Sequence, residues 1–275
     1  MKIKDFNIKI GKYTFHKLIK HTGLQEVVTE YETVENGIGD GVLILGAQVL
    51  EREIEIEAPI PINEADAISR YFEPNKYYDL VIGKRYINVL CRHSDIDRRT
   101  NLYNQPILLL TLFAPDPFFY DVSDFGENIA GSVPLFGFPW EASLDEGLNF
   151  GYREFNERTI FDNNGDRPVG LKMKIEFIGA VSNFKFENLR TGKYFKINHE
   201  FVKDDVLEIS TVSGDTYVRL NTADIFEQID IFSDFFKLEK GANFLKYSAD
   251  KGVTEMNVYL YYSPKYLTGM EDIEL

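Results

Sequence analysis

The sequence predicts a mainly β protein built from two domains. The chain has 275 residues, which exceeds the roughly 100–150 residues of the commonest domains. Aromatic side chains make up 14% of it, with 22 Phe and 16 Tyr, and such rings favour strands. Hydrophobic residues reach 44% and charged residues 27%, a balance typical of folded globular chains.

The first elements are predicted to be two strands followed by a glycine cluster. Residues 1–10 alternate imperfectly between polar and apolar side chains, and residues 24–36 continue as a second strand. Gly37, Gly39 and Gly41 follow at every second position. Glycine populates backbone conformations closed to other residues, so this spacing favours a flexible or sharply turned segment.

One long strand is predicted over residues 41–62, and it carries a row of carboxylates. Strand side chains alternate between two faces. One face therefore receives Glu51, Glu53, Glu55 and Glu57, and the other receives Arg52, Ile54 and Ile56.

Residues 63–74 predict the clearest helix. Asn63 is a favourable N-cap, and Pro74 cannot continue a helix. Ala65, Ile68 and Phe72 then lie on one apolar face. Residues 77–96 follow as a hairpin that turns at Gly83 and Lys84.

An abrupt break ends the first half, in the stretch LLLTLFAPDPFFYD from Leu108 to Asp121. Proline has no backbone donor, so Pro115 and Pro117 end strand pairing near Ala114. Asp116 can accept bonds from backbone amides and hold the turn. We expect Phe118, Phe119 and Tyr120 to plug the bottom of the domain, which makes this stretch a domain exit and not a catalytic loop.

The second half predicts a β-sandwich. Residues 121–160 are rich in Gly, Pro and acidic residues and indicate an extended connector. From Phe161 onward, short strands recur between turn signals such as NNGD and TVSGDT, a pattern typical of sandwiches. The expected domains are residues 1–127 and 128–275, and residues 223–236 are ambiguous between helix and strand.

Charge and cysteine content limit the function classes. The formal net charge of −14 disfavours binding to nucleic-acid phosphates, which requires a surplus of Lys and Arg. A single cysteine, Cys91, allows no intrachain disulfide. The sequence lacks both an apolar leader after MKIKD and a run of about 18 apolar residues, so we expect cytoplasmic synthesis and no membrane span.

Catalytic and ligand motifs are weak. Cys91 and His93 are two residues apart, so we expect both side chains on one face of a strand, where a nucleophile–base pair is conceivable. No neighbouring residue is expected to orient the imidazole. The histidines lack metal spacing, and DNNGDR (residues 162–167) fits a hairpin turn better than a calcium loop. Trp140 is a candidate sugar platform or partner anchor, although packing of the connector explains it better.

The chain resembles the distal tail proteins, the Dit family, of long-tailed phages with Gram-positive hosts. ILLLTLFAPDPFFYD is similar to the strand and exit of that family. The similarity continues through DNNGDRPVGLKMKIEFIGAVSNFKFENLRTGK, VLEISTVSGDTYVRLN, IDIFSDFFKLEKGANFLKYSA and YLYYSPKYLTG. The resemblance covers nearly the whole chain. No single motif is diagnostic, and the ordered set carries it.

This resemblance implies a structural protein at the tail tip of the virion. The N-terminal domain, β-barrel or sandwich-like with one helix, forms a hexameric ring around a channel, often with an arm that clasps the next subunit. The C-terminal domain is a galectin-like β-sandwich that points outward. Expected partners are other copies of the chain, the tail tube protein, the tail-associated hub protein and receptor-binding proteins. No cofactor and no catalysis are implied.

Within that scheme, two segments each have an ordinary structural interpretation and a functional one. Gly37, Gly39 and Gly41 lead into Val42, Leu43, Ile44 and Leu45, which form either an ordinary buried strand or an arm buried against a neighbour. The row from Glu51 to Glu57 is either a solvated sheet face or a channel lining past which DNA slides without binding. Six copies would carry six times −14, or −84, and apolar interfaces must offset this repulsion.

Two other functions remain open from sequence. The second domain alone is a candidate carbohydrate-binding module that recognises saccharide of the host wall. An enzyme such as a wall hydrolase is the third class, although carboxylates are so frequent in this chain that pairs of them indicate nothing.

Overall fold

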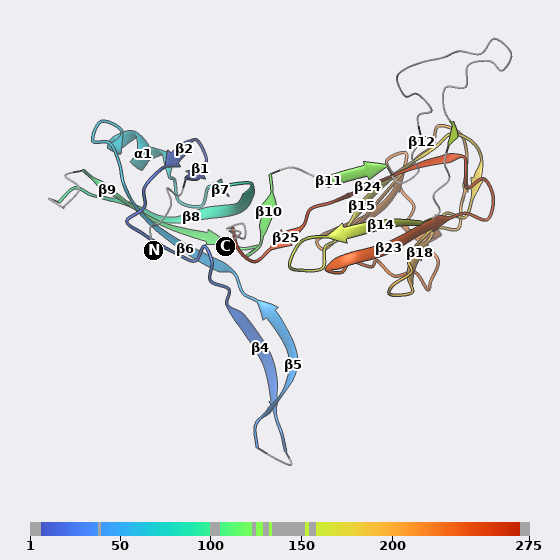
Figure 1. The fold of residues 1–275 in the computed structure, drawn as a ribbon, viewed down its shortest axis with the longest axis horizontal. Helices are drawn as coiled ribbons and strands as arrows, with labels where there is room; N and C mark the ends of the chain where they lie inside the picture. The colour runs from blue at the N-terminus through green and yellow to red at the C-terminus, as the bar shows by residue number, and fades with distance from the viewer. Residues whose placement is uncertain are drawn as a thin grey trace, which may run out of the picture. The chain divides into compact units, whose positions relative to one another are not determined.

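The computed structural model describes residues 7–37, 40–99, 105–122, 125–128, 132–133, 152–153 and 158–269. It divides into two units, one formed by Met1–Ser123 with Lys265–Leu275 and the other by Asp124–Pro264 (Figure 1). The boundary expected between residues 127 and 128 thus lies near the observed division. The last segment differs, because β25 (Lys265–Tyr266) pairs with β10 (Phe119–Asp121) in unit 1.

Within the described residues, unit 1 contains a nine-stranded sheet in the order β2-β1-β7-β8-β9-β6-β3, with β10 beside β8 and β25 beside β10. All of its pairings are antiparallel. The strands not yet given are β1 (Ile8–Ile10), β2 (Tyr13–Phe15), β3 (Lys20–Thr22), β6 (Arg52–Pro59), β7 (Tyr77–Ile82), β8 (Arg85–Asp97) and β9 (Ile107–Ala114).

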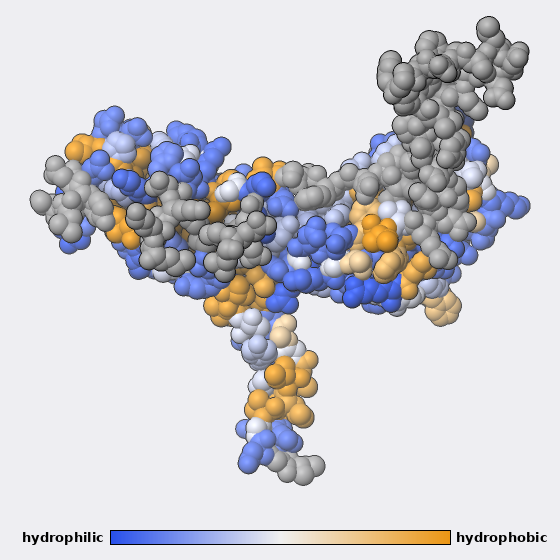
Figure 2. Space-filling view, in the orientation of Figure 1, coloured by the Kyte–Doolittle hydropathy of each residue, from blue (hydrophilic) through white to orange (hydrophobic). Residues whose placement is uncertain are grey.

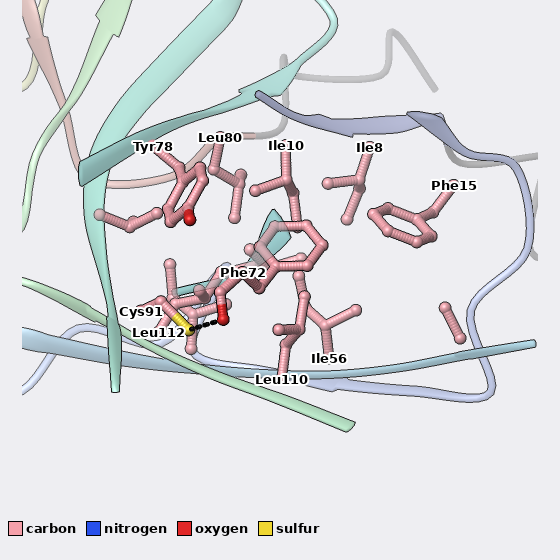
Figure 3. Packing of buried hydrophobic residues seen from close by; sticks show 14 of the residues in the cluster. Ile8, Ile10, Phe15, Ile56, Phe72, Tyr78, Leu80, Cys91, Leu110 and Leu112 are labelled. Atoms are coloured by element: carbon pink, nitrogen blue, oxygen red, sulfur yellow. Dashed lines mark hydrogen bonds between the residues drawn. The ribbon is translucent and has the colours of Figure 1, made fainter. Parts of the chain in front are cut away.

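This sheet curls around one apolar core, as the barrel-like prediction requires. Figure 3 shows Ile8, Ile10 and Leu80 on one wall and Ile56 and Leu110 on the opposite wall, all buried. Inward and outward side chains alternate along the strands, so that β9 buries every second residue. Burial of these side chains holds unit 1 together.

The helix α1 (Ala65–Tyr71) packs against the same core. Ala65, Ile68 and Phe72 are buried, as its apolar face predicts. The expected N-cap is wrong: Glu64 occupies that position and no side chain caps the helix. The helix ends with the backbone N–H of Phe72 donating to the carbonyl of Ile68, two residues before Pro74.

A hairpin leaves the sheet of unit 1. It consists of β4 (Thr29–Glu35) and β5 (Val42–Val49), which pair only with each other in the described residues. The single strand expected over residues 41–62 is therefore two strands, β5 and β6, interrupted at Leu50 and Glu51. The chain divides there because β6 buries alternate side chains in the core, whereas β5 has no core to cover it.

Unit 2 is a β-sandwich, as predicted. Its six-stranded sheet has the order β11-β24-β15-β20-β21-β22, and its four-stranded sheet has the order β14-β23-β17-β18. Both contribute to one core, in which Ile175 and Leu207 come from the first sheet and Phe186 and Leu245 from the second. The expected hairpin at NNGD is wrong, because these residues connect β14 of one sheet to β15 of the other.

The six-stranded sheet consists of β11 (Phe125–Asn128), β15 (Lys172–Phe177), β20 (Val206–Val212), β21 (Asp215–Leu220), β22 (Ala223–Asp224) and β24 (Met256–Tyr262). The four-stranded sheet consists of β14 (Arg158–Asn163), β17 (Lys185–Asn188), β18 (Lys193–Lys196) and β23 (Gly241–Ser248). Two short pairs add β12 (Ser132–Val133) with β13 (Tyr152–Arg153), and β16 (Val181–Ser182) with β19 (Glu200–Phe201). A short 3-10 helix, η1 (Phe226–Gln228), lies in the ambiguous segment.

Among the described residues, no helix has the length and apolar character needed to span a bilayer. Most of the connector expected over residues 121–160, including Trp140, lies outside the described residues.

Candidate functional site

The β4–β5 hairpin exposes the apolar run singled out in the sequence. Val42, Leu43, Ile44 and Leu45 are 57%, 56%, 62% and 62% exposed. Neighbours along a strand point to opposite faces, so both faces of the ribbon are uncovered. Figure 2 shows hydrophobic atoms gathered along the hairpin.

Such a hairpin is unfavourable in an isolated chain. Its outer strand edges carry unpaired backbone groups, and its apolar side chains remain in water. A two-stranded ribbon is also only marginally stable alone. The structure places Gly37 and Gly41 at its turn, with Gly41 at φ +92°, while Gly39 lies outside the described residues. The arrangement fits a segment that is covered by another molecule.

The base of the hairpin is tightly built. Gly23 has φ +76°, and a β-carbon there would lie 1.9 Å from the carbonyl oxygen of Glu53. The backbone N–H of Gly23 donates to the Glu26 carboxylate at 2.6 Å. A hollow of about 290 Å³ opens beside it, with Val27, Val28 and Leu50 in its lining.

Three of the four glutamates of the acidic row lie on the outer face of β6. Arg52, Ile54 and Ile56 point inward, and Glu53 and Glu55 point outward. The row also includes Glu57 on β6 and the exposed Glu51, which directly precedes this strand.

The sequence did not reveal that cations accompany these carboxylates. Lys20 Nζ lies 3.2 Å from Glu55 and 3.9 Å from Glu57, and Arg92 forms an ion pair with Glu53. Three glutamates with one lysine and one arginine sum to a single negative charge. Because all five side chains are substantially exposed, each pair contributes little to stability.

Strand β8, which is separated from β6 by β9, also carries both charges near its end. At the end of β8, Arg99 donates to the Asp97 carboxylate from its side chain at 2.7 Å and from its backbone N–H at 2.9 Å. These hydrogen bonds lower the pKa of Asp97 to about 2. The sheet face therefore has mixed charge and is not uniformly anionic.

The domain exit forms a compact cluster around Asp116. Its carboxylate accepts the Tyr120 hydroxyl at 2.5 Å and the backbone N–H of Phe118 at 3.3 Å. Lys265 Nζ lies 3.5 Å from the same carboxylate and above the rings of Phe118 and Tyr120. Burial and the bond to Asp116 raise the pKa of Tyr120.

The exit departs from expectation in one respect. Strand β9 ends at Ala114, as Pro115 and Pro117 predict. Only Phe119 enters the core, however, while Phe118 and Tyr120 are half-buried beside Lys265. The rings differ because successive residues of an extended chain face opposite sides.

Arg52 is the structural residue that sequence reasoning missed. It is 5% exposed and donates to the carbonyls of Gly23, Pro117 and Leu267. Burial lowers its pKa from the usual arginine value, and Glu26 opposes that shift. The sequence did contain one indication of its burial, because strand alternation places Arg52 on the same face as Ile54 and Ile56.

Cys91 and His93 do not share a strand face, so the conceivable nucleophile–base pair does not form. A β-bulge between these residues breaks the alternation of β8, so that Cys91 enters the core while His93 is exposed. The Cys91 thiol packs 3.9 Å from the carbonyl of Phe72, and burial raises its pKa. In the part of the chain that the structure describes, no group of three acidic, His or Cys residues is arranged to hold a metal.

Comparison with known proteins agrees with this architecture. The family model described as the siphovirus-type tail component, C-terminal domain, matches residues 164–266. Residues 164–266 of this chain therefore match the C-terminal domain of siphovirus-type tail components. This matched range covers most of the unit 2 sandwich and confirms the resemblance seen in the sequence.

Solved structures extend the likeness in fold to both units of the chain. The crystal structure of the SPP1 Dit protein, described as a paradigm of the hub adsorption apparatus in phages that infect Gram-positive bacteria, matches with a TM-score of 0.67. It is 14% identical, and the match covers 95% of this chain and 99% of that one. At that identity the likeness shows the fold.

Two structures of the phage P2 baseplate in its activated conformation, with Ca and with Sr, also match at 11% identity. Each covers 96% of this chain and 99% of the other, with a TM-score of 0.46. A search of curated proteins found no match.

Proposed function

We propose that this chain is the ring-forming distal tail protein of a long-tailed phage. Six copies close into a ring at the tail tip, which joins the tail tube protein to the tail-associated hub protein. The ring supports receptor-binding proteins, and the chain acts by assembly and not by catalysis. It is made in the cytoplasm of the bacterial host and then enters the virion.

The exposed hairpin carries this proposal. A closed ring uses one patch on each copy to contact a different patch on the next. The hairpin offers such a patch, because Val42 to Leu45 are uncovered and its edges are unpaired. Burying these four side chains against a neighbour would stabilise the interface by several kcal/mol, at about 25 cal/mol per Å² of apolar surface.

The outer face of β6 fits the channel side of such a ring. DNA binds proteins by releasing counterions from its phosphates to Lys and Arg. In this face, Lys20 and Arg92 already have carboxylate partners, and Glu51 adds a further negative charge. A surface of this kind lets DNA pass without holding it.

Light scattering on the purified full-length chain tests the ring. We expect the wild type to reach six times the chain mass at high concentration or after addition of the hub protein. The variant Leu43→Asp/Leu45→Asp should remain a single chain, because each hairpin buried against a neighbour would carry two unpaired charges. The matched control is Ile62→Asp, which alters a 70% exposed apolar residue outside the hairpin.

Two outcomes contradict the proposal. One is a wild type that stays a single chain at every concentration and with the hub protein present. The other is a Leu43→Asp/Leu45→Asp variant that assembles as well as the wild type.

A further inference from the structure

An unusual turn lies in unit 2, on the segment that begins with β22. From Ala223 to Phe236 the chain passes through η1 and then runs beside β18 without joining its sheet as a strand. At Asp230–Ser233 it turns, with the backbone N–H of Ser233 donating to the carbonyl of Asp230 at 2.9 Å. Ile231 and Phe232 occupy the two corner positions and are 88% and 78% exposed.

The turn is held in one shape from both sides. The backbone N–H of Asp230 donates to the carbonyl of Lys196 at 2.9 Å, and that of Asp234 donates to the carbonyl of Tyr194 at 2.8 Å. The Ser233 hydroxyl accepts the backbone N–H of Lys196 at 2.9 Å. These bonds fix the turn to the edge of β18.

Asp230 fixes the corner itself. Its carboxylate accepts the backbone N–H of Phe232 at 3.0 Å and the hydroxyl of Tyr194 at 3.3 Å. An aspartate that bonds the N–H two residues ahead stabilises a tight turn. The exposure of Ile231 and Phe232 is therefore a property of an ordered turn, which we call the apolar tip.

Apolar residues are unfavourable at these positions. Turn corners are usually Gly, Pro, Asn, Asp or Ser, and the local hydrogen bonds would survive with polar side chains there. Two large apolar side chains in water give no folding stabilisation. Rigid apolar anchors do, however, provide most of the energy at protein interfaces, because little entropy is lost when they dock.

The segment that carries the apolar tip is acidic, although Lys196 of β18, whose backbone bonds the turn, and Lys237 adjoin it. The segment 223–236 contains four acidic residues and no Lys or Arg. Glu227 and Asp234 are exposed, and neither forms an ion pair with any described residue. Their carboxylates are thus available to cations of another molecule.

We propose that the apolar tip inserts Ile231 and Phe232 into an apolar pocket, bordered by Lys and Arg, on a different protein of the phage tail. A second copy of the same tip is disfavoured, since like charges would face each other. An anionic lipid surface or polyanionic wall polymer is disfavoured for the same reason. The inference rests on the proposed assembly role but uses a surface separate from the β4–β5 hairpin.

Site-specific cross-linking tests this assignment. A photoreactive phenylalanine analogue replaces Phe232 in the full chain, supplied to a phage from which the corresponding gene is deleted. After irradiation of assembled virions, mass spectrometry identifies what the tip touches. We expect a protein cross-link to another tail component, at an apolar site with adjacent basic residues.

Plating efficiency of the complemented phage measures the contribution of the tip. Loss of two anchors of about 2 kcal/mol each weakens an interface roughly a thousandfold, so Ile231→Ser/Phe232→Ser should lower plating at least tenfold. Glu227→Lys/Asp234→Lys should also lower it, by repelling the basic border. The matched control, Ile160→Ser/Phe244→Ser, alters another exposed apolar pair of unit 2 and should plate within about threefold of wild type.

The results separate this inference from the ring proposal. In light scattering, the tip variant should have the same mass as the wild type. If the ring proposal is wrong, neither the wild type nor the tip variant should reach six times the chain mass. Cross-links confined to copies of this chain, or to saccharide, overturn the inference. So does normal plating by the tip variant.

Discussion

Arg52 and Leu267 are 215 residues apart in sequence, yet the Arg52 guanidinium donates to the Leu267 carbonyl at 2.7 Å. The same group donates to Gly23 at the base of the hairpin and to Pro117 at the domain exit. One buried side chain therefore joins the beginning of β6 to three segments that would otherwise meet only through short pairings.

Replacement of Arg52 by alanine should destabilise unit 1 by about 3 kcal/mol, because buried carbonyls lose charged donors. Arg52→Lys should recover only part of this, since one ammonium cannot reproduce the guanidinium fork. Urea unfolding followed by hydrogen exchange in peptides covering residues 110–122 measures the change. Arg98→Ala is the control, because Arg98 pairs with Asp66 on the surface. An equal effect of both variants would show that the three hydrogen bonds of Arg52 do not stabilise unit 1.

Gly23→Ala should cost more than Gly83→Ala. Both glycines have positive φ, at +76° and +58°, and that conformation alone costs an alanine about 1–2 kcal/mol. Only at Gly23 would the new methyl group also meet backbone, at 1.9 Å from Glu53, whereas the space at Gly83 is open. Denaturation midpoints of the two variants measure the difference, and equal midpoints would show that the backbone at Gly23 moves freely.

The carboxylate face of β6 should govern DNA passage. Changing Glu51, Glu53, Glu55 and Glu57 to lysine adds phosphate-binding charge beside Lys20 and Arg92. We expect rings to assemble while DNA ejection from virions slows about tenfold at low salt, with recovery at high salt. The four-glutamine variant, which removes charge without adding cations, should eject nearly normally. Unchanged kinetics of the lysine variant would place this face outside the channel.

Local pattern was sufficient for much of the fold. Period-two burial in β6 and β9, the apolar face of α1 and the end of β9 at Ala114 all follow from short-range side-chain chemistry. The sandwich of unit 2 was predictable from its closely spaced strands and turns. Each of these features depends on residues that are neighbours in sequence.

Other features depend on contacts that sequence spacing does not encode. The bulge that separates Cys91 from His93 is set by the pairing of β8 with β9. Lys20 and Arg92 reach the glutamates from β3 and β8, which adjoin β6 and β9 only after folding. The apolar tip lies in a segment whose sequence pattern fits both a helix and a strand. Its exposure results from the hydrogen bonds that hold the turn against β18.

The pairing of β25 with β10 has a consequence for protein engineering. Tyr120 is paired with Lys265, so the chain leaves unit 1 and returns to it at adjacent positions. A turn of a few residues could join these strands directly and leave the first fold whole. Unit 2 is thus an insertion in unit 1, which protein engineering could delete or replace at this point without interrupting the sheet of unit 1.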